Sequence, residues 1–146
     1  MFVKGQIFYF TPFYLKNGNT SKNKYFIVLK TIANNVIVAS LPKSVNIAPT
    51  LIDKLHGCIN QDDRCFNCYA FEAKKVITNN GFSFPISTYL YGNEVETYNI
   101  DVLASVYQIE NIDYKIIGTL TSQEYENIYT CLQNSSSIKR GIKKLL

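Results

Sequence analysis

Four residues of metal-binding type lie close together near the middle of the chain: His56, Cys58, Cys65 and Cys68. One imidazole and three thiolates form a ligand set that suits tetrahedral zinc. The spacing of His56 and Cys58 is tighter than in most structural zinc sites. The alternative is that Cys58 and Cys68 pack in strands as small apolar residues, with the other two near the surface. We therefore expect the protein to hold little zinc, and we expect no other cofactor.

His56 is the only histidine in the 146 residues. A catalytic pair of histidines is thus excluded within one chain, and acid–base chemistry would need His56, a carboxylate, a tyrosine or a lysine. The sequence has no phosphate-binding glycine loop, dinucleotide fingerprint, nucleophile elbow or His-Glu-x-x-His motif. These absences argue against the common nucleotide-binding, hydrolase and metalloprotease classes.

Lysines are concentrated in the first third of the chain. Residues 1–54 hold seven lysines and one aspartate, a net charge of +6, whereas residues 55–127 have a net charge of −6 and residues 128–146 one of +4. A basic surface favours a polyanionic partner, because neutralising phosphates drives most non-specific nucleic-acid binding. Ordinary solvated lysines on loops are the alternative.

The length of the chain suits one compact domain. No run of eighteen apolar residues follows the pattern of a membrane span, and the N-terminus lacks the apolar stretch of a secretory signal. We therefore expect a single domain over residues 1–146 in the cytoplasm, without membrane contact, and a flexible basic tail over residues 135–146. A reducing compartment would keep all four cysteines, including Cys131, as thiols.

Many aromatic and β-branched residues indicate a chain rich in strands. A first strand is expected over residues 5–10, reaching Tyr14 if Pro12 lies at an edge or a bulge. Residues 25–29 and 36–41 are expected to form a hairpin, because the asparagines between them tolerate a positive φ. Further strands are expected at residues 68–72, 75–77, 88–91 and 114–117.

Two helices carry start signals. Asn99 is a suitable N-cap for a short helix over residues 100–106 that has an apolar face. The stretch from Thr121 to Glu124 matches a capping box, and a hydrophobic staple is available across it. The apolar stripe that follows has the spacing of a core-facing helix and consists of Tyr125, Ile128, Tyr129 and Leu132.

The order of these segments resembles the MazF/PemK family of toxin–antitoxin ribonucleases. Residues 4–10 are similar to the family's opening strand, residues 24–29 and 36–44 to its next two strands, and residues 120–124 to the start of its last helix. The resemblance covers residues 4–44 and 118–134. It implies a β-rich α+β fold, in which antiparallel strands form a small SH3-like barrel with a C-terminal helix, and it implies a homodimer.

The resemblance also implies a chemistry, in which the 2′-hydroxyl of RNA attacks the adjacent phosphorus without a metal ion. Lys24 stands where the family usually has an arginine, and Ser44 stands near its strand-ending threonine. Lys24 is thereby implied to stabilise the developing charge and Ser44 to orient the reactants, although lysine lacks the planar fork with which arginine grips phosphate. The lysines implied to bind RNA are Lys16, Lys22, Lys43 and Lys74.

The function implied by this resemblance is a toxin-like endoribonuclease that cleaves single-stranded RNA and is neutralised by a cognate antitoxin protein. Two alternatives stay open. One is a barrel module that binds RNA or protein without cleavage. The other is a zinc-stabilised structural or interaction protein.

Overall fold

The computed structural model describes residues 2–14, 21–42, 54–61, 63 and 66–146. Within these ranges the chain forms two antiparallel sheets with three helices, which confirms the expected β-rich α+β class. None of the described helices has the length and apolar composition that crossing a bilayer requires.

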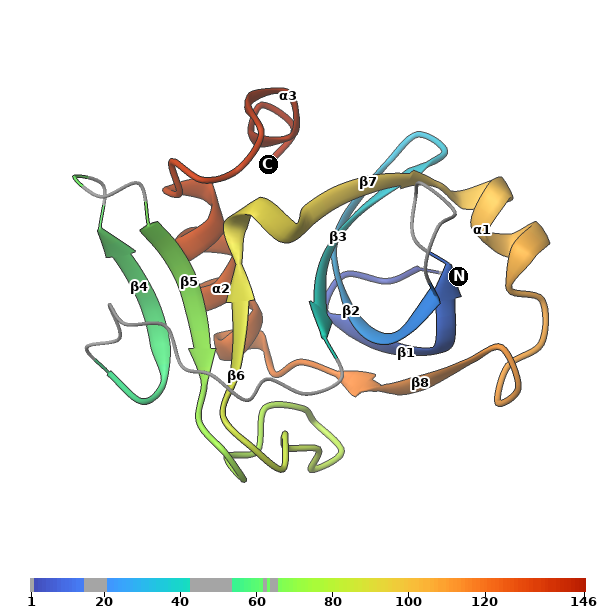
Figure 1. Ribbon diagram of the computed structural model, residues 1–146, viewed down its shortest axis with the longest axis horizontal. Helices are drawn as coiled ribbons and strands as arrows, with labels where there is room; N and C mark the ends of the chain where they lie inside the picture. Colours follow the sequence, from blue (N-terminus) through green and yellow to red (C-terminus); the bar gives the residue numbers. More distant parts are fainter. Residues whose placement is uncertain (1, 15–20, 43–53, 62, 64–65) are drawn as a thin grey trace.

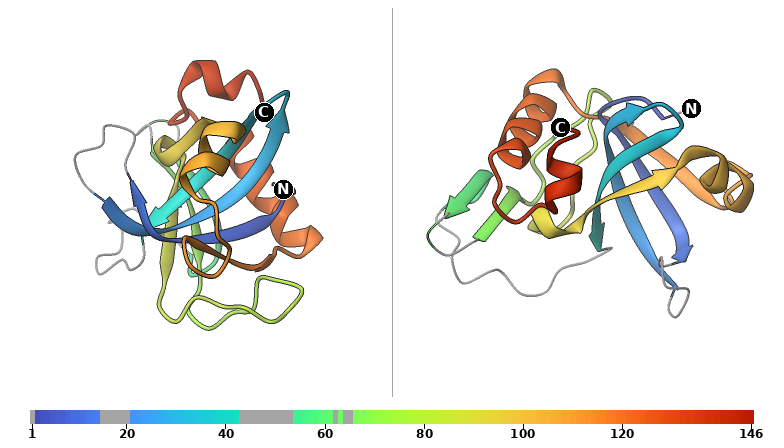
Figure 2. Two further views of the ribbon diagram at one scale, coloured as in Figure 1. Left: turned by 90° about the vertical axis from the view of Figure 1, so that its right-hand side faces the viewer. Right: turned by 90° about the horizontal axis from the view of Figure 1, so that it is seen from above.

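The first sheet has five strands in the order β7-β3-β2-β1-β8. It is strongly bent, so that β1 and β2 curve around one end of the molecule (Figures 1 and 2). Among the described residues it does not close into a barrel, because β7 and β8 remain as its two edges. Its strands are β1 (Gln6–Tyr14), β2 (Ser21–Ile32), β3 (Asn35–Pro42), β7 (Val95–Asn99) and β8 (Tyr114–Thr119).

Local sequence signals account for most of this sheet. The predicted hairpin is present as β2 and β3, but the positive φ of 52° belongs to Ala33 and not to an asparagine. The predicted irregularity near Pro12 is a register shift between Phe10 and Phe13, on a strand that is paired on both sides as far as Phe10. Pro12 is tolerated because the β8 ladder ends before it.

The second sheet has three strands and is inserted in the sequence between β3 and β7. It consists of β4 (Gly57–Gln61), β5 (Phe66–Phe71) and β6 (Thr88–Tyr91). A 3-10 turn, Gly92–Glu94, returns the chain to the first sheet. Gly92 is needed there, because a Cβ atom would lie 2.7 Å from both Asn67 Oδ1 and Ser135 Oγ.

Three of the four further strands predicted after the first hairpin are present, and one is not. The strands expected near residues 68–72, 88–91 and 114–117 are present as β5, β6 and β8. Residues 75–77 are not a strand, and their neighbour Thr78 makes only an isolated bridge to Leu120. Strands β4 and β7 were not predicted, because neither has a regular alternation of apolar and polar residues.

Helices α1 (Ile100–Val106) and α2 (Ser122–Gln133) begin where they were predicted. Asn99 Oδ1 accepts the Val102 N–H at 3.1 Å, and Thr121 Oγ1 accepts the Glu124 N–H at 3.2 Å. The other half of the predicted capping box is missing, since the Thr121 N–H donates to the Ile77 carbonyl instead. A short third helix, α3 (Arg140–Lys143), lies near β7.

The described residues form three apolar cores, of which the smallest lies on the second sheet and the other two border the candidate sites. One of these two lies between the two sheets and α2, and it buries Ile128 and Leu132 of the predicted helical stripe. The other lies inside the bend of the first sheet, beneath α1. We call this second core the aromatic cluster; its aromatic members are Phe8, Phe10, Phe13, Phe26, Tyr107 and Tyr114.

Candidate functional site

Lys24 lies in the middle of the five-stranded sheet, on β2. Its cross-strand partners are Phe10 on β1 and Pro42 on β3. Because side chains alternate along a strand, Lys24 shares a face with Phe26 two residues further on. Phe10 and Phe26 are 2% exposed, whereas Lys24 is half-buried. The ammonium-bearing side chain thus borders the aromatic cluster.

Several residues of the predicted RNA-binding, catalytic and zinc sites lie outside the part of the chain that the structure describes. Lys16, Lys43, Ser44 and Cys65 lie outside the described residues, and the Lys22 side chain is not described either. Ser44 follows Pro42 after a single residue, and Pro42 is the partner of Lys24. The structure therefore places Lys24, and it places the end of β3 two residues before Ser44.

The opposite face of the same strands carries a row of basic and aromatic side chains. Lys115 on β8, Tyr9 on β1 and Tyr25 on β2 are directly opposite one another in the register. The Tyr9 and Tyr25 rings are 4.6 Å apart and half-buried, and Lys115 is exposed. Burial raises the pKa of Tyr25, and Tyr9 adds to this effect.

Lys74, a predicted RNA-binding residue, lies at the end of this row. Its φ is 65°, and its N–H donates to the Phe84 carbonyl at 2.8 Å. The Phe84 ring is 5.2 Å from the Tyr25 ring. Lys74 is exposed, and its backbone is linked to the Tyr25 ring only through Phe84.

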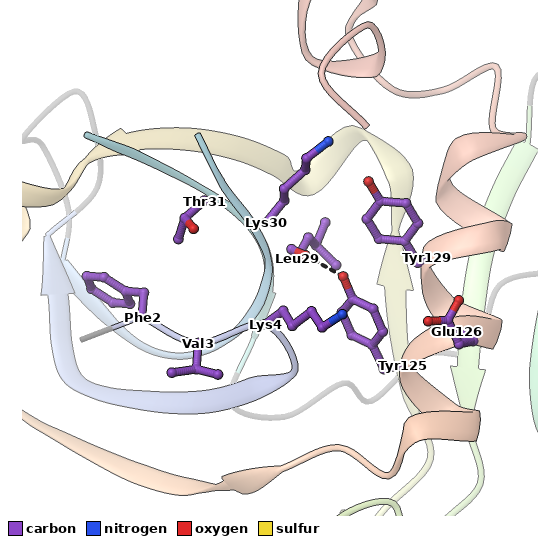
Figure 3. Close-up of a pocket in the computed structure, with 9 residues that line it drawn as sticks. All are labelled: Phe2, Val3, Lys4, Leu29, Lys30, Thr31, Tyr125, Glu126 and Tyr129. Carbon is purple, nitrogen blue, oxygen red and sulfur yellow. Dashed lines mark hydrogen bonds between the residues drawn. The ribbon is translucent and has the colours of Figure 1, made fainter. Parts of the chain in front are cut away.

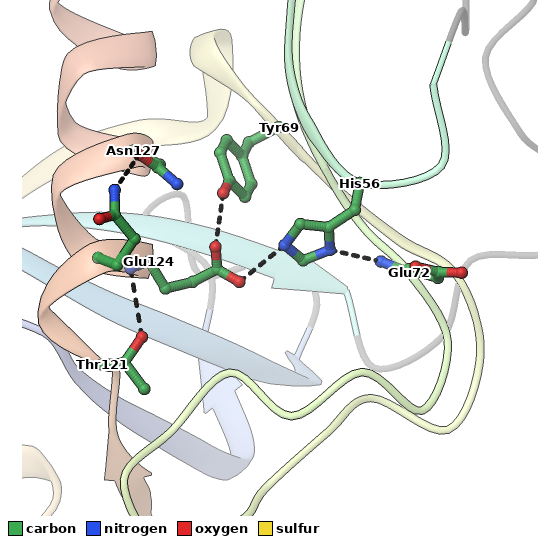
Figure 4. Close-up of polar contacts among 7 residues, drawn as sticks. His56, Tyr69, Glu72, Thr121, Glu124 and Asn127 are labelled. Carbon is green, nitrogen blue, oxygen red and sulfur yellow. Dashed lines mark hydrogen bonds and ion pairs between the residues drawn. The ribbon is translucent and has the colours of Figure 1, made fainter.

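His56 belongs to a buried polar network that joins the second sheet to α2 (Figure 4). Its Nδ1 accepts the Glu72 N–H at 3.0 Å, and its Nε2 lies 2.7 Å from Glu124 Oε1. Since Nδ1 accepts a hydrogen bond, the proton is on Nε2 and is donated to the carboxylate. The only imidazole is thus engaged through both nitrogens and is not poised as a general base.

Tyr69 completes this network from β5. Its hydroxyl donates to Glu124 Oε2 at 2.7 Å, so that the carboxylate accepts one bond at each oxygen. Burial, followed by the bond to Glu124, raises the pKa of Tyr69 well above its usual value. The phenol stays protonated and serves as a donor. We assign the network a structural role, since every group in it is satisfied within the chain.

The expectation of free thiols is wrong for two of the cysteines. Cys58 and Cys131 form a disulfide that joins β4 to α2, with a sequence separation of 73. Cys58 is therefore not available as a zinc thiolate in this state. Cys68 is buried in β5 and takes no part in the disulfide, as the packing alternative proposed. Among the described residues no group of three metal-ligating side chains comes together.

The disulfide forms part of the wall of an open pocket of about 380 Å³. His56 and Tyr69 contribute to its lining, together with the amide side chains of Asn60, Asn127 and Asn134. Asn60 Nδ2 donates to the Asn134 carbonyl at 2.9 Å, which ties the strand to the helix. The pocket offers amide groups but no free acid, base or nucleophile among these residues.

A larger pocket of about 610 Å³ lies between the first sheet and α2 (Figure 3). Its two phenolic hydroxyls form hydrogen bonds within the chain: Tyr125 donates to the Leu29 carbonyl at 2.6 Å, and Tyr129 donates to the Leu146 carbonyl at 3.2 Å. Lys30 Nζ donates to the Leu145 carbonyl at 2.9 Å. These bonds attach the C-terminal segment to the sheet, and we assign the pocket no chemistry.

Sequence reasoning missed the polar network and the disulfide. Glu124 was predicted only as part of a capping box and Tyr69 only as part of a strand, while Glu72 was predicted at a strand end, near the family's RNA-contacting pair. The one available signal was the apolar helix position of Cys131, which follows Ile128 by three residues and faces the core. That position does not indicate which cysteine is its partner.

Comparison with protein-family models, with curated proteins and with solved structures finds no match to this chain. The residues and their geometry must therefore carry the functional argument.

Proposed function

We propose that this chain is a MazF/PemK-like toxin, an endoribonuclease that cleaves single-stranded RNA without a metal ion. The observation that carries the proposal is the position of Lys24. It is held between β1 and β3 by the register, at the border of a rigid aromatic cluster. A half-buried cation on a central strand is better preorganised than a lysine on a loop, and preorganised charge is what stabilises a transition state.

The order of the strands supports the same proposal. The segments that resemble the family fall on β1, β2, β3 and the start of α2, in that order along the chain. The finer features stay part of the proposal: an SH3-like barrel, a homodimer, a cytoplasmic location and neutralisation by a cognate antitoxin.

In the proposed reaction, the 2′-hydroxyl oxygen bonds to the adjacent phosphorus as the bond to the 5′-oxygen breaks. The 2′-hydroxyl loses a proton and the leaving 5′-oxygen gains one, so that a cyclic phosphate and a 5′-hydroxyl result. Lys24 places its ammonium group against the negative charge that grows on the phosphoryl oxygens. Ser44, close to Pro42 in the chain, orients the reacting hydroxyl.

Cleavage of a long unstructured RNA in the presence of a chelator tests this proposal. Lys24→Ala should lower the cleavage rate by about 10²–10³-fold, as the loss of one charge-stabilising contact typically does. Lys24→Arg should keep or raise the rate, since it restores bidentate phosphate geometry. Lys54→Ala, at an exposed lysine away from this strand, is the matched control.

Circular dichroism should show that each variant keeps the fold of the wild type. Equal cleavage by the wild type and Lys24→Ala would remove Lys24 from the mechanism. A wild type that never cleaves would favour a second candidate function, which is RNA binding without cleavage.

This second candidate is favoured by the row of Lys115, Tyr9 and Tyr25. Aromatic rings beside lysines suit single-stranded nucleic acid, because bases stack on the rings while the cations meet the backbone. The row lies on the face of the sheet opposite to Lys24. A Lys115→Glu variant tests this candidate. If it binds RNA more weakly but cleaves at the wild-type rate when RNA is saturating, binding on this face is separate from chemistry at Lys24.

A further inference from the structure

Helix α1 leaves much of its apolar surface uncovered. Leu103 is buried beneath it, but Val102 is 59% exposed and Val106 is 50% exposed. The turn that follows continues the same character, with Ile109 52% and Ile112 65% exposed. Among the described residues, four of the ten exposed large apolar side chains lie in this short stretch. We call these four residues the α1 surface. Such clustering marks an interaction site rather than ordinary scatter.

A pocket of about 310 Å³ opens beside the α1 surface. Its floor consists of aromatic rings that belong to the aromatic cluster or pack against it, and Val102 and Val106 form one wall. The main contributors are Phe13, Tyr98, Leu103 and Tyr107. The Phe13 ring is 5.6 Å from Tyr98 and 5.3 Å from Tyr107, so the rings of the floor pack against one another. The pocket thus forms an apolar binding site that could hold one bulky side chain of a partner.

The surroundings of this pocket are acidic. Residues 76–114 contain five carboxylates and no lysine or arginine. Asp101 directly precedes the α1 surface and Glu110 lies between Ile109 and Ile112, and both are exposed. Glu94 in the 3-10 turn and Glu96 on β7 precede Tyr98 at two-residue spacing, and burial, followed by the charges of Glu96, Tyr107 and Glu94, raises the pKa of Tyr98 to about 12. An RNA backbone would be repelled here, whereas a cationic partner would be attracted.

The molecule already contains one example of this recognition. Helix α3, which carries Arg140 and Lys143, lies against β7. Lys139 at its N-cap forms an ion pair with Glu96, and Ile142 packs against the core between the sheets. Strand β7 therefore binds a short basic segment through one carboxylate, while an apolar side chain of that segment packs against the neighbouring core. The α1 surface lies further along the same strand, at the end of the molecule remote from β4 (Figures 1 and 2).

We propose that the α1 surface is the docking site for a basic amphipathic helix of a partner protein, with one leucine-sized side chain seated in the pocket beside Tyr98. The helix lays its apolar face along Val102, Val106 and Ile109. Its lysines or arginines meet Asp101 and Glu110 at the rim. The Lys24 site and the α1 surface border the same aromatic cluster, but α1 and β7 contribute none of the proposed catalytic residues, so helix binding can be measured separately from cleavage.

A fluorescent synthetic helix of about 18 residues, with leucines at i, i+3, i+4 and i+7 and lysines on both flanks, serves as the probe. Anisotropy should give a Kd below about 100 μM for the full-length protein. Val102→Ser/Val106→Ser should weaken binding by about tenfold or more, because two exposed valines lose their partner contacts. Val76→Ser is the matched control, at a valine that is 55% exposed elsewhere.

A second pair of measurements tests the charge requirement. Asp101→Asn/Glu110→Gln should weaken binding of the basic helix and reduce its dependence on salt. The same helix with glutamate in place of each lysine should bind at least about tenfold more weakly to the wild type. Circular dichroism should confirm that both double variants are folded, as their exposed positions lead us to expect.

Three results would overturn the proposal. One is a Kd unchanged by the Val102/Val106 double substitution. Another is equal affinity for the basic and acidic helices, which would indicate non-specific apolar adhesion. The third is a sedimentation experiment in which the wild type self-associates and Val102→Ser/Val106→Ser is monomeric, since the occupant of this face would then be a second copy of the chain.

Discussion

The two sheets of this protein are stabilised by different combinations of interactions. The first is built from hairpins between neighbouring strands and is filled by the aromatic cluster, with Phe8, Phe10 and Phe26 almost fully buried. The second is joined to α2 by specific bonds between distant residues. The disulfide spans 73 positions and the His56–Glu124 bond spans 68. The comparison teaches that apolar burial stabilises both halves, since Phe71 and Leu90 of the second sheet are also fully buried, whereas the second half depends in addition on a few particular pairs.

The largest expected effect tests the first half of this comparison. Phe26→Ala should lower the free energy of unfolding by about 3–5 kcal/mol, because it removes a buried ring that contacts Phe10, Phe13 and Tyr98 and leaves a cavity. Ile116→Ala, at a residue 40% exposed on β8, should cost less than about 1 kcal/mol. Denaturant unfolding measures both. Similar losses for the two variants would show that the aromatic cluster is not the main source of stability in this sheet.

Removal of the disulfide should have the next largest effect. Cys58→Ser/Cys131→Ser should lower stability by about 2–4 kcal/mol, since the cross-link closes a long loop in the unfolded chain. Hydrogen exchange should accelerate in β4 and β5 more than in β2 and β3. Cys68→Ser, at the buried cysteine outside the disulfide, is the control that leaves the cross-link intact. Uniform acceleration across both sheets would mean that the two halves unfold as one unit.

Disruption of the polar network should have the smallest of these three effects. Glu124→Ala leaves the His56 N–H and the Tyr69 hydroxyl without their acceptor, and we expect a loss of about 1–3 kcal/mol. Glu124→Gln should cost less, because its carbonyl can accept from His56 while its amide donates to the Tyr69 oxygen. Thermal unfolding followed by circular dichroism compares the pair. A larger loss for Gln than for Ala would show that the carboxylate does not act as the shared acceptor.

The sequence predicted best where local pattern decides the structure. The hairpin of β2 and β3, the caps at Asn99 and Thr121 and the strand β6 all follow from short-range propensity. Residues 75–77 were misassigned because three residues cannot establish a period. The partner of Cys58 and the partners of Glu124 could not be predicted, since pairs so distant in the chain are brought together only by the tertiary fold.

The candidate sites divide in the same way. Lys24 could be found because it follows a polar loop at the start of an apolar strand. The α1 surface could be foreseen only in part: the apolar face of the helix was recognised, but the pattern does not show that Leu103 is covered while Val102 and Val106 are not. Exposure depends on what packs against a helix, and that information lies in β7 and the aromatic cluster.

The pairing of β1 with β8 has a consequence for how the protein is made. Strand β1 leaves the ribosome early, but Ile116, the partner of Phe8, is among the later residues to be translated. At synthesis rates of about 5–20 residues per second, about 5–20 s pass between the synthesis of β1 and that of β8. During that interval the nascent chain exposes an aromatic strand edge, the kind of template on which other chains add. Ribosome-associated chaperones would therefore meet this protein at its N-terminal hairpins.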